Sequence, residues 1–438
     1  MSHYANGDYQ VDVKPLKPLS RSVSIIGVGA TPFTNVLEDP DYQGLTEGEF
    51  FGYAAIEAMK DAHLTPKDVE YYFHGAATPT FQSGYVTPNM QVANWFGMKG
   101  RASSHHSEAC CTGYVALEQA VNLVASGTYD IVLSGTCEFA VGKALLNKPA
   151  YQRRLTTMED LLPGLQSIWA NDYTRPSKAA NAMAADAWLD EYVREHGLTP
   201  TQVDDRLCAM AKNCREEAVL NPLGGSHETY DQLGAQFGMG ADEFLRSQFN
   251  PFASKYLRMS NFELDVDGAA AVIVCPTEIA HRYTDKPIEV LGTGHSCLEG
   301  GTARLEKYAT QAAYRQISEL TGLTGADMDL LLTNDFMMGS QMLSAEEVGY
   351  VPRGEGWELF ADGTTTFRGE RPVNTNGGRC HYGHAHGASG MADVYEAVKQ
   401  MRGEAGDTQV KRPINYAMLR GFGGGQNVTC SILRNTNA

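Results

Sequence analysis

Two short segments of the sequence carry residues suited to acyl transfer. Residues 374–390 read Asn-Thr-Asn-Gly-Gly-Arg-Cys-His-Tyr-Gly-His-Ala-His-Gly-Ala-Ser-Gly, and residues 108–114 read Glu-Ala-Cys-Cys-Thr-Gly-Tyr. A glycine-rich turn with a histidine, paired with a cysteine that opens a helix, suits thioester chemistry, because sulfur holds an acyl group while imidazole moves protons. The residues predicted to do this are Cys110 and His384.

Cys110 is predicted to lie in the first turn of a helix over residues 110–126. Unpaired backbone N–H groups and the positive end of the helix dipole at that position stabilise a thiolate. We therefore expect its pKa to fall below the free value of about 8.5. The alternative is that Cys110 and Cys111 are two small buried apolar residues, and physics alone does not choose between the two thiols.

His384 lies between Gly383 and Gly387, directly before an apolar helix, so its ring is predicted to face a cavity from a turn. One alternative is a surface turn that binds nothing. Another is a metal site, because four possible ligands fall within seven residues: Cys380, His381, His384 and His386. The flanking glycines and the helix that follows disfavour the metal.

The elements that must position these residues alternate between strands and helices. The apolar patterns predict strands at residues 23–29, 69–74, 102–106, 129–135, 264–275, 288–294, 328–333, 414–419 and 427–433. They predict helices at residues 46–63, 89–96, 110–126, 302–321, 339–348 and 387–401, the first with Thr46 as N-cap and Glu49 three residues on. This alternation indicates an α/β protein with a mostly parallel, helix-covered sheet.

The order of the predicted strands and helices along the chain indicates four regions. Residues 1–21 form an N-terminal extension, residues 22–139 plus 260–280 a first α/β half, residues 140–259 an inserted, mostly helical region, and residues 281–438 a second half. The similar order of elements suggests a duplicated unit. No repeat is visible at the level of single residues.

Composition excludes several classes of partner. The net charge of −17 over 438 residues argues against nucleic acid and anionic membranes. No apolar run reaches the roughly 20 residues that span a bilayer, and the N-terminus lacks a secretory pattern. The nine cysteines are scattered, odd in number and without paired zinc spacing, which predicts reduced thiols in a cytoplasmic protein.

Taken together, these segments resemble the thiolase superfamily. Residues 374–390 are similar to the family's Asn-x-x-Gly-Gly-(x)4-Gly-His-Pro-x-Gly-Ala-Ser/Thr-Gly pattern, and Cys110 to Gly113 to its Cys-Ser/Ala-Ser/Thr-Gly pattern. Asp267-Gly-Ala-Ala and Gly421-Phe-Gly-Gly-Gly-Gln resemble two further family motifs. Asn334-Asp-Phe-Met stands where many thiolases carry Asn-Glu-Ala-Phe. The likeness runs from about Ser22 to Arg434.

The resemblance implies a fold, an activity and roles for residues. The fold is a duplicated five-layer α-β-α-β-α core, usually a dimer or a tetramer, and the cosubstrate is coenzyme A. Cys110 would attack the ketone carbon of a 3-oxoacyl-CoA, and His384 would activate the thiol. Asn334 would hold a water that helps to stabilise the enolate. The amides of Cys110 and Gly423 would bind the oxyanion. Three arginines of the inserted region are the candidates for gripping the nucleotide: Arg153, Arg154 and Arg175.

The sequence also departs from the family pattern. The second acid/base cysteine of degradative thiolases is replaced by Gly421, its sterol-carrier-type alternative by Phe336, and the usual proline after the histidine by Ala385. We expect Cys380 to serve as the second acid/base, since a thiol of near-neutral pKa matches the missing group. His381, His386 and Glu108 are the further candidates.

Relatives that lack this second cysteine often work with a small partner built from a zinc ribbon and an OB-fold. They include archaeal acetoacetyl-CoA thiolases, steroid side-chain aldolases and benzoylsuccinyl-CoA thiolases of anaerobic toluene breakdown. The sequence most resembles the thiolase subunit of the last group, which implies release of benzoyl-CoA and succinyl-CoA. Trp169, Tyr173 and Phe336 would then line an aromatic pocket, although such residues also serve simple packing. The other functions considered are CoA-ester retro-aldol cleavage, Claisen condensation and a non-catalytic scaffold.

Overall fold

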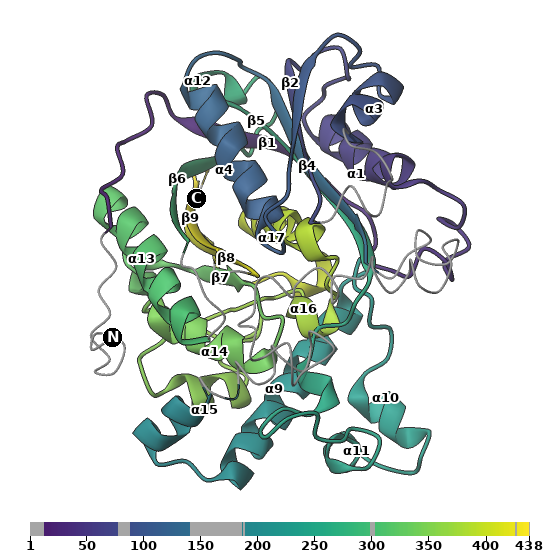
Figure 1. Ribbon diagram of the computed structural model, residues 1–438, viewed down its shortest axis with the longest axis vertical. Helices are drawn as coiled ribbons and strands as arrows, with labels where there is room; N and C mark the ends of the chain where they lie inside the picture. Colours follow the sequence, from purple (N-terminus) through teal and green to yellow (C-terminus); the bar gives the residue numbers. More distant parts are fainter. Residues whose placement is uncertain are drawn as a thin grey trace, which may run out of the picture.

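The computed structural model describes residues 13–77, 88–140, 186, 189–297, 303–424 and 427–437 (Figure 1). One mixed sheet has the strand order β3-β2-β4-β5-β1-β6-β9-β8-β7. The strands are β1 Val23–Ala30, β2 Tyr71–Gly75, β3 Ala102–His106, β4 Val132–Phe139, β5 Asp267–Pro276, β6 Ile288–Cys297, β7 Leu330–Thr333, β8 Tyr416–Gly423 and β9 Asn427–Asn435. The helices are α1 Glu47–Asp61, α3 Pro88–Trp95, α4 Thr112–Ala125, α9 Pro200–Leu220, α10 Tyr230–Ala235, α11 Ala241–Arg246, α12 Thr277–Ala280, α13 Ala303–Thr321, α14 Met338–Glu347, α15 Gly356–Ala361, α16 Gly378–His381 and α17 His386–Arg402.

The sheet consists of two halves that repeat one pattern of pairing. In the first half, β1 pairs antiparallel with β5, β5 antiparallel with β4, and β4 parallel with β2. In the second half, β6 pairs antiparallel with β9, β9 antiparallel with β8, and β8 parallel with β7. The halves join where β1 pairs antiparallel with β6. The described strands therefore contain the duplicated α/β arrangement that the sequence predicted. The predicted mostly parallel sheet is wrong, because β5 and β9 run antiparallel to both of their neighbours and five of the eight strand pairings are antiparallel.

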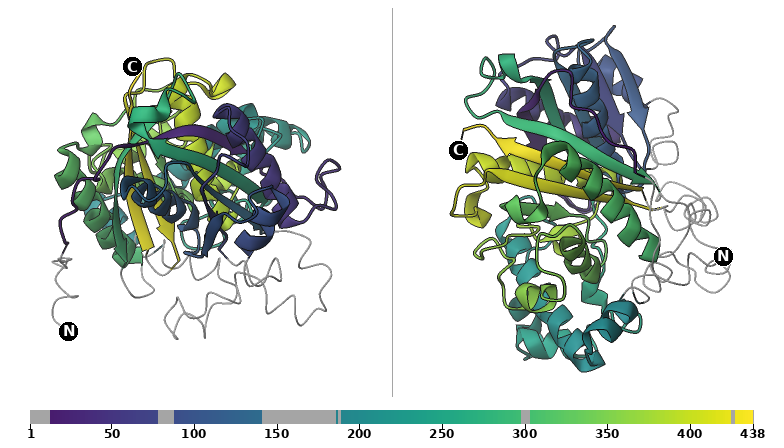
Figure 2. Two further views of the ribbon diagram at one scale, coloured as in Figure 1. Left: turned by 90° about the horizontal axis from the view of Figure 1, so that it is seen from above. Right: turned by 90° about the vertical axis from the view of Figure 1, so that its left-hand side faces the viewer.

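Three clusters of buried apolar residues lie between the layers of helices and strands. One cluster packs α1 on the first half of the sheet, and another packs α13 and α14 on the second half. The third lies between the halves and contains α4 and α17 together with inward-facing residues of both halves. Figure 2 shows the same arrangement from two further sides. The predicted five-layer α-β-α-β-α core is confirmed.

The first strand of each half lies in close contact with the helix that follows it, β1 with α1 and β6 with α13. Both strands carry a β-bulge, between Ile25 and Gly27 in β1 and between Val290 and Gly292 in β6. A side chain on Gly29 would meet the Ala54 carbonyl oxygen of α1 at 2.2 Å. Its counterpart in β6 is crowded as well, because a side chain on Gly294 would meet an α13 carbonyl oxygen at 1.9 Å. Glycine lets each helix lie directly on its strand.

The helix starts follow the local chemistry that the sequence contains. At α1, the Thr46 hydroxyl accepts a hydrogen bond from the Glu49 backbone N–H at 3.3 Å, and the Glu49 carboxylate accepts one from the Thr46 N–H at 2.8 Å. This reciprocal pair is the predicted capping box. The predicted start of α4 at Cys110 is wrong by two residues, because the chain makes a separate turn before Thr112.

Helices α4 and α17 lie side by side between the halves, and a buried polar network ties them together. A side chain on Gly113 would stand 2.3 Å from the Met391 nitrogen, so the two helix backbones are in contact. The Arg379 guanidinium donates to both oxygens of Asp393, at 2.8 and 2.7 Å, and to the Tyr114 hydroxyl at 2.9 Å. Arg379 and Asp393 are each only 1% exposed. Removing one partner would leave a buried charge unpaired, so the network fixes the register between the helices.

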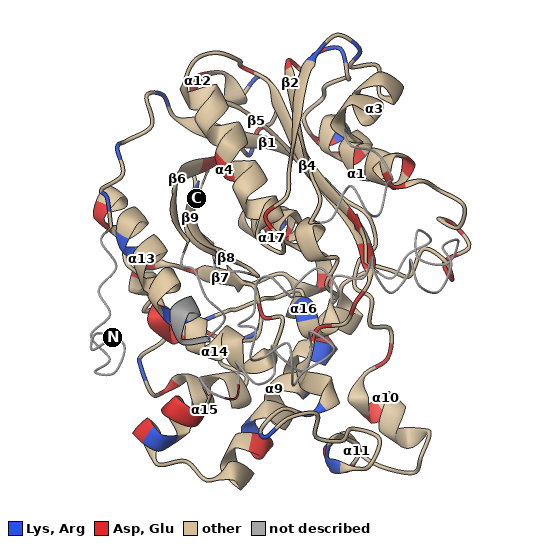
Figure 3. Ribbon diagram, viewed as in Figure 1, with Lys and Arg blue, Asp and Glu red and all other residues tan. Residues whose placement is uncertain are grey.

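Helices α9, α10 and α11 lie between β4 and β5 along the chain and form a group below the sheet in Figure 1. Charged residues of both signs gather on α9 and α11, whereas α4 is almost uncharged (Figure 3). The predicted region boundaries stay predictions, and residues 1–12 and 141–185 lie outside the described residues. No helix within the described ranges is long and apolar enough to cross a membrane.

Candidate active site

Cys110 lies in a tight turn between β3 and α4. Ala109, directly before it, has a φ of +48°, a conformation unfavourable for a residue with a side chain. The Thr112 hydroxyl donates to the Ala109 carbonyl oxygen at 2.6 Å and accepts from the Glu108 backbone N–H at 2.8 Å. Cys111 is the N-cap residue of α4. Cys110 therefore precedes the helix instead of lying in its first turn, and the turn holds its thiol out from the helix end.

His384 lies in the loop between α16 and α17, beside the strand-like segment that leads into β5. Its backbone N–H donates to the Leu264 carbonyl oxygen at 2.7 Å, and Asp265 forms an isolated parallel bridge with it. The His384 Nδ1 atom lies 3.2 Å from the Ser389 hydroxyl, which also accepts the Ala385 N–H at 2.9 Å. Backbone and ring are thus both fixed, and only 2% of His384 is exposed.

The structure brings Cys110 and His384 together from opposite halves of the chain. The Cys110 Sγ atom lies 3.2 Å from the His384 Nε2 atom, within hydrogen-bond reach for sulfur. When Nδ1 carries the ring hydrogen and donates it to Ser389, Nε2 is left to accept the thiol proton. The Ser389 contact is compatible with the tautomer in which the ring acts as a base toward Cys110. Ser389 lies in the Ala-Ser-Gly of the histidine motif but was not among the residues predicted to act in the site.

The expected acidification of Cys110 is wrong. Burial raises the pKa of the Cys110 thiol to about 12, and the charges of Glu263, Glu138 and Asp265 add to the rise. The nearby Arg379 guanidinium lowers this pKa but does not offset the other effects. The resting pair is therefore a neutral thiol beside an imidazole, and the thiolate forms only as His384 takes the proton.

Cys111, the second thiol of the pair, faces another direction. It is fully buried, and its Sγ atom lies 3.7 Å from the Thr429 hydroxyl of β9. Burial raises its pKa beyond the range of ordinary thiols. The structure thus separates two cysteines that the sequence left equivalent, because Cys110 alone of the two contacts the histidine.

Gly423, at the end of β8, packs directly on the cysteine turn. A Cβ atom there would stand 2.7 Å from the Glu108 carbonyl oxygen and 3.0 Å from the Cys111 nitrogen. Gly421 is equally crowded, since a Cβ atom would meet the Tyr114 ring at 2.4 Å. There is no space at Gly421 for the cysteine that degradative thiolases carry at the corresponding place.

We expect Gly423→Ala to lower both stability and activity. The added methyl group must push the turn away, which typically costs about 1–3 kcal/mol of folding free energy. Displacing a nucleophile by roughly 1 Å can slow a reaction about 100-fold. Thermal unfolding and the rate of Cys110 acylation by p-nitrophenyl acetate would measure both effects. Gly240→Ala is the matched control, because a Cβ atom there meets nothing within 4 Å; an effect equal to the control would contradict the prediction.

Asn334 follows β7 and is fully buried. Its side-chain amide donates to the Phe422 carbonyl oxygen at 2.7 Å, and its side-chain oxygen accepts the Phe336 N–H at 3.1 Å. The rings of Phe336 and Phe422 stack with centroids 5.2 Å apart. Asn334 therefore holds the backbone next to Gly423, and its predicted role in binding a water stays a prediction.

The premise on which Cys380 was chosen as second acid/base is wrong. Its side chain is buried, and the thiol donates to the carbonyl oxygens of Asp335 and Asn261 at 3.2 and 3.5 Å. Burial, reinforced by the Asp335 charge, raises the pKa of the Cys380 thiol well above its usual value. A thiol that is this hard to ionise and is bound to backbone oxygens does not exchange protons readily near neutral pH.

His381 and Glu108, two further candidates for the second acid/base, make other contacts. His381 packs against the Tyr230 ring with centroids 5.6 Å apart, and burial lowers its pKa well below the usual value. The Glu108 carboxylate accepts a hydrogen bond from Asn427 at 2.9 Å. His386, by contrast, lies with its ring centroid 5.2 Å from that of His384.

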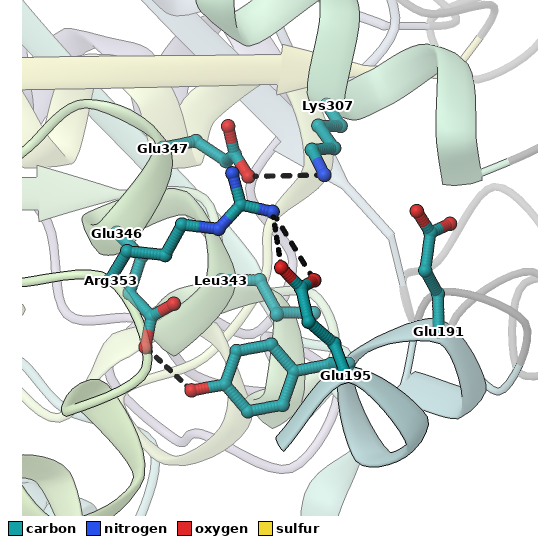
Figure 4. A pocket seen from close by; sticks show the side chains of 8 residues that line it. Glu191, Glu195, Lys307, Leu343, Glu346, Glu347 and Arg353 are labelled. Atoms are coloured by element: carbon teal, nitrogen blue, oxygen red, sulfur yellow. Dashed lines mark hydrogen bonds and ion pairs between the residues drawn. The ribbon is translucent and has the colours of Figure 1, made fainter. Parts of the chain in front are cut away.

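Arg153, Arg154 and Arg175 lie outside the described residues, as do Trp169 and Tyr173. A shallow pocket with about 260 Å³ of space, part of it open to solvent, lies between α13, α14 and residues 189–196 (Figure 4). Its two cations are paired, Lys307 with Glu347 at 3.6 Å and Arg353 with Glu195 at 3.3 Å. It shares no lining residue with the Cys110–His384 site. Across the described ranges, no group of three or more potential ligand side chains is placed to hold a metal.

Comparisons with known proteins show similarity to thiolases along most of the chain. Residues 298–435 match the family described as "Thiolase C-terminal domain-like". The acetyl-CoA acetyltransferase of Methanothermobacter thermautotrophicus is 28% identical over 400 residues, which cover 89% of this chain and 94% of that protein. The benzoylsuccinyl-CoA thiolase subunit BbsB of Thauera aromatica is 29% identical over 416 residues, which cover 93% and 96% of the two chains.

A solved structure described as "Ltp2-ChsH2(DUF35) aldolase" superposes with a TM-score of 0.72 at 21% identity, covering 95% of this chain and 98% of that one. At that identity the likeness concerns the fold alone. The predicted resemblance to the thiolase superfamily is confirmed.

Proposed function

We propose that this chain, a relative of the thiolase superfamily with the fold of that superfamily, is a thiolase-type acyl-CoA acyltransferase. It would cleave a 3-oxoacyl-CoA with coenzyme A through an acyl group carried on Cys110. The single observation that supports this most is the 3.2 Å approach of Cys110 Sγ to His384 Nε2. Two relatives with high mutual coverage are named as an acetyl-CoA acetyltransferase and a thiolase subunit, which supports the same reaction class.

In this proposal the nucleophile is generated only when needed. His384 Nε2 takes the proton of Cys110 as the sulfur attacks the ketone carbon, and Ser389 holds the other ring nitrogen. The backbone N–H groups of Cys110 and Gly423 would donate to the resulting oxyanion, a contact worth about 3–4 kcal/mol per donor. The close packing of Gly423 on the cysteine turn supports this assignment.

We propose a bulky or aromatic acyl group as substrate, such as that of benzoylsuccinyl-CoA. The 29% identity to a benzoylsuccinyl-CoA thiolase subunit supports it, and so does the stacked pair Phe336 and Phe422 beside Gly423. Coenzyme A is the proposed cosubstrate, with Arg153, Arg154 and Arg175 as proposed nucleotide contacts.

We also propose that the chain forms a homodimer core and works with a small zinc-ribbon/OB-fold partner. The description of the solved fold relative includes a DUF35 protein, which supports a partner of that kind. Retro-aldol cleavage on the same fold is the alternative. It needs no acyl-cysteine, and the close Cys110–His384 pair speaks against it.

The test is an assay of the purified chain with a panel of aliphatic and aromatic 3-oxoacyl-CoA esters, with and without proteins that co-purify from the native host. We expect CoA-dependent cleavage and an acyl adduct on Cys110 detectable by mass spectrometry. Cleavage without any need for free CoA and without an adduct would instead establish the aldolase. Absence of cleavage for every ester, with the partner present, would refute the proposal.

A further inference from the structure

His386 stands beside the Cys110–His384 pair but is not part of it. Its ring centroid lies 5.2 Å from that of His384 with the planes at 68°, and its side chain is only 13% exposed. The Nε2 atom lies 3.8 Å from the Asp265 carboxylate. The Nδ1 atom is buried, and none of the described residues forms a hydrogen bond with it. His106, His196 and His381 also have buried ring nitrogens without a partner among the described residues, so the feature that distinguishes His386 is its position beside His384.

The backbone at His386 is strained. Its φ of +33° is a value that residues with side chains rarely adopt, and it begins α17 with no side-chain cap. Ala109, directly before Cys110, has a positive φ of +48° as well. Strain of this kind persists where the surrounding structure imposes a side-chain position, and it gathers at functional sites.

Three carboxylates surround the His386 ring, and the fourth titratable neighbour is His384 itself. Asp265 pairs with it, Glu138 accepts the Gly387 N–H at 3.3 Å, and Glu263 lies on the same segment as Asp265. Burial acts to lower the pKa of His386, but the contact with the Asp265 carboxylate and the charges of Glu138, Asp265 and Glu263 leave this pKa raised. These carboxylates therefore favour the protonated form of the His386 ring more than water does, and the ring lies beside a histidine positioned to accept a proton.

We propose that His386, held by Asp265, is the second acid/base of the site and exchanges protons with the C2 carbon of the departing acyl-CoA and with the thiol of the incoming coenzyme A. The assignment rests on the proposed thiolase function. The assignment of His386 fills the role of second acid/base. Gly421 has no side chain for that role, and the Cys380 thiol is buried and hydrogen-bonded.

Every proton that leaves a group during one catalytic cycle is returned by its end. The Cys110 proton passes to His384, sulfur bonds to the ketone carbon, and the C2–C3 bond breaks with its electron pair on C2. The His386 cation gives its proton to C2, which releases the first acyl-CoA. Neutral His386 then takes the proton of the CoA thiol, and the CoA sulfur bonds to the acyl carbon. Cys110 leaves and recovers its proton from His384, so both histidines return to their starting states.

The test compares His386→Gln with His281→Gln, a matched control at the exposed end of α12. The first readout is the exchange of the C2 hydrogens of acetyl-CoA for deuterium in D₂O, which needs the acid/base but not the nucleophile. The second is acylation of Cys110 by p-nitrophenyl acetate, which needs no proton at C2. The third is cleavage of the best 3-oxoacyl-CoA found in the panel.

For His386→Gln we expect exchange and cleavage to fall by about 100-fold or more, with Cys110 acylation within about threefold of wild type. Cys110→Ser should show the opposite pattern, with exchange kept and acylation lost. Exchange and cleavage near wild-type rates in His386→Gln would overturn the assignment while leaving the proposed function intact. A wild-type protein that neither cleaves nor becomes acylated would refute the proposed function, and the assignment with it.

Asp265→Asn provides a second test, which also decides the matter if His386→Gln does not fold. Cleavage requires the protonated ring, so it declines as pH rises through the pKa of His386. Removing the negative charge of Asp265 lowers that pKa, so the declining limb of the pH profile should move to lower pH. A limb that stays where it is in wild type would overturn the assignment.

Discussion

Replacing Cys110 by alanine should lower thiolytic turnover by about 10⁴-fold or more, since the acyl group then has no atom to bind. The neighbouring thiol does not substitute, because Cys111 faces Thr429 of β9 and its pKa is raised further. The measurement is steady-state cleavage together with intact-protein mass spectrometry after brief exposure to substrate. Wild type should gain the mass of one acyl group, and Cys110→Ala should gain none.

Cys297→Ala is the matched control for this result. Cys297 is an exposed cysteine among the described residues, and the site does not use its thiol. We expect its replacement to leave turnover within about twofold and the acyl adduct in place. Turnover in Cys110→Ala close to that of the control would show that the reaction proceeds without a covalent acyl-cysteine, as in a retro-aldolase.

Replacing His384 by glutamine should slow Cys110 acylation by about 10²–10⁴-fold at neutral pH, because the thiol loses its general base. The pH dependence carries a second signature. With the pKa of Cys110 at about 12, roughly one thiol in ten thousand is ionised at pH 8 without help. The rate in His384→Gln should therefore rise about tenfold per pH unit far into the alkaline range, because only the ionised sulfur reacts.

Wild type should lack that steep rise, because His384 accepts the proton during the attack. The measurement is the rate of p-nitrophenyl acetate acylation between pH 6 and pH 10, with His281→Gln as control. A flat profile in His384→Gln would mean that the thiolate exists before substrate binds, contrary to the raised pKa. The two profiles thus test the electrostatics of the site separately from its geometry.

Much of the fold could be predicted because its signals are local. The apolar spacing and the capping box at Thr46 identify α1 from a short stretch of sequence, and the alternation of strands and helices identifies the sheet. The pairing of Cys110 with His384 could be predicted only from the resemblance of two distant motifs to one family. Their composition alone left several alternatives open.

The acidity of Cys110 could not be predicted, because it depends on contacts between distant segments. A helix N-terminus is visible in the sequence, but burial is not, and neither is the approach of Glu263 and Asp265 to the histidine loop. Cys380 was misjudged for the same reason. Its type fits the missing group, whereas its burial and its two carbonyl partners appear only in three dimensions.

The duplication has a residue-level signature that becomes visible once the strands are aligned. Gly27-Val-Gly29 in β1 corresponds to Gly292-Thr-Gly294 in β6, each after a β-bulge and each under the helix that follows its strand. A three-residue pattern with two glycines is too short to stand out in 438 residues. The pairing of the strands supplies the alignment that the sequence lacks.

The nucleophile and its base also stand at matching places, one before α4 and the other at the start of α17, the helices that precede β4 and β8. Neither half contains both members of the pair. The first half contributes the Cys110 thiol and the second half contributes the His384 imidazole that accepts its proton. Fragments cut between β5 and β6 should each be inert, and mixing them should restore turnover only if they reassociate. The reactive pair exists only at the interface between the two halves. A protein consisting of one half would therefore need to associate with a second copy to form such a site.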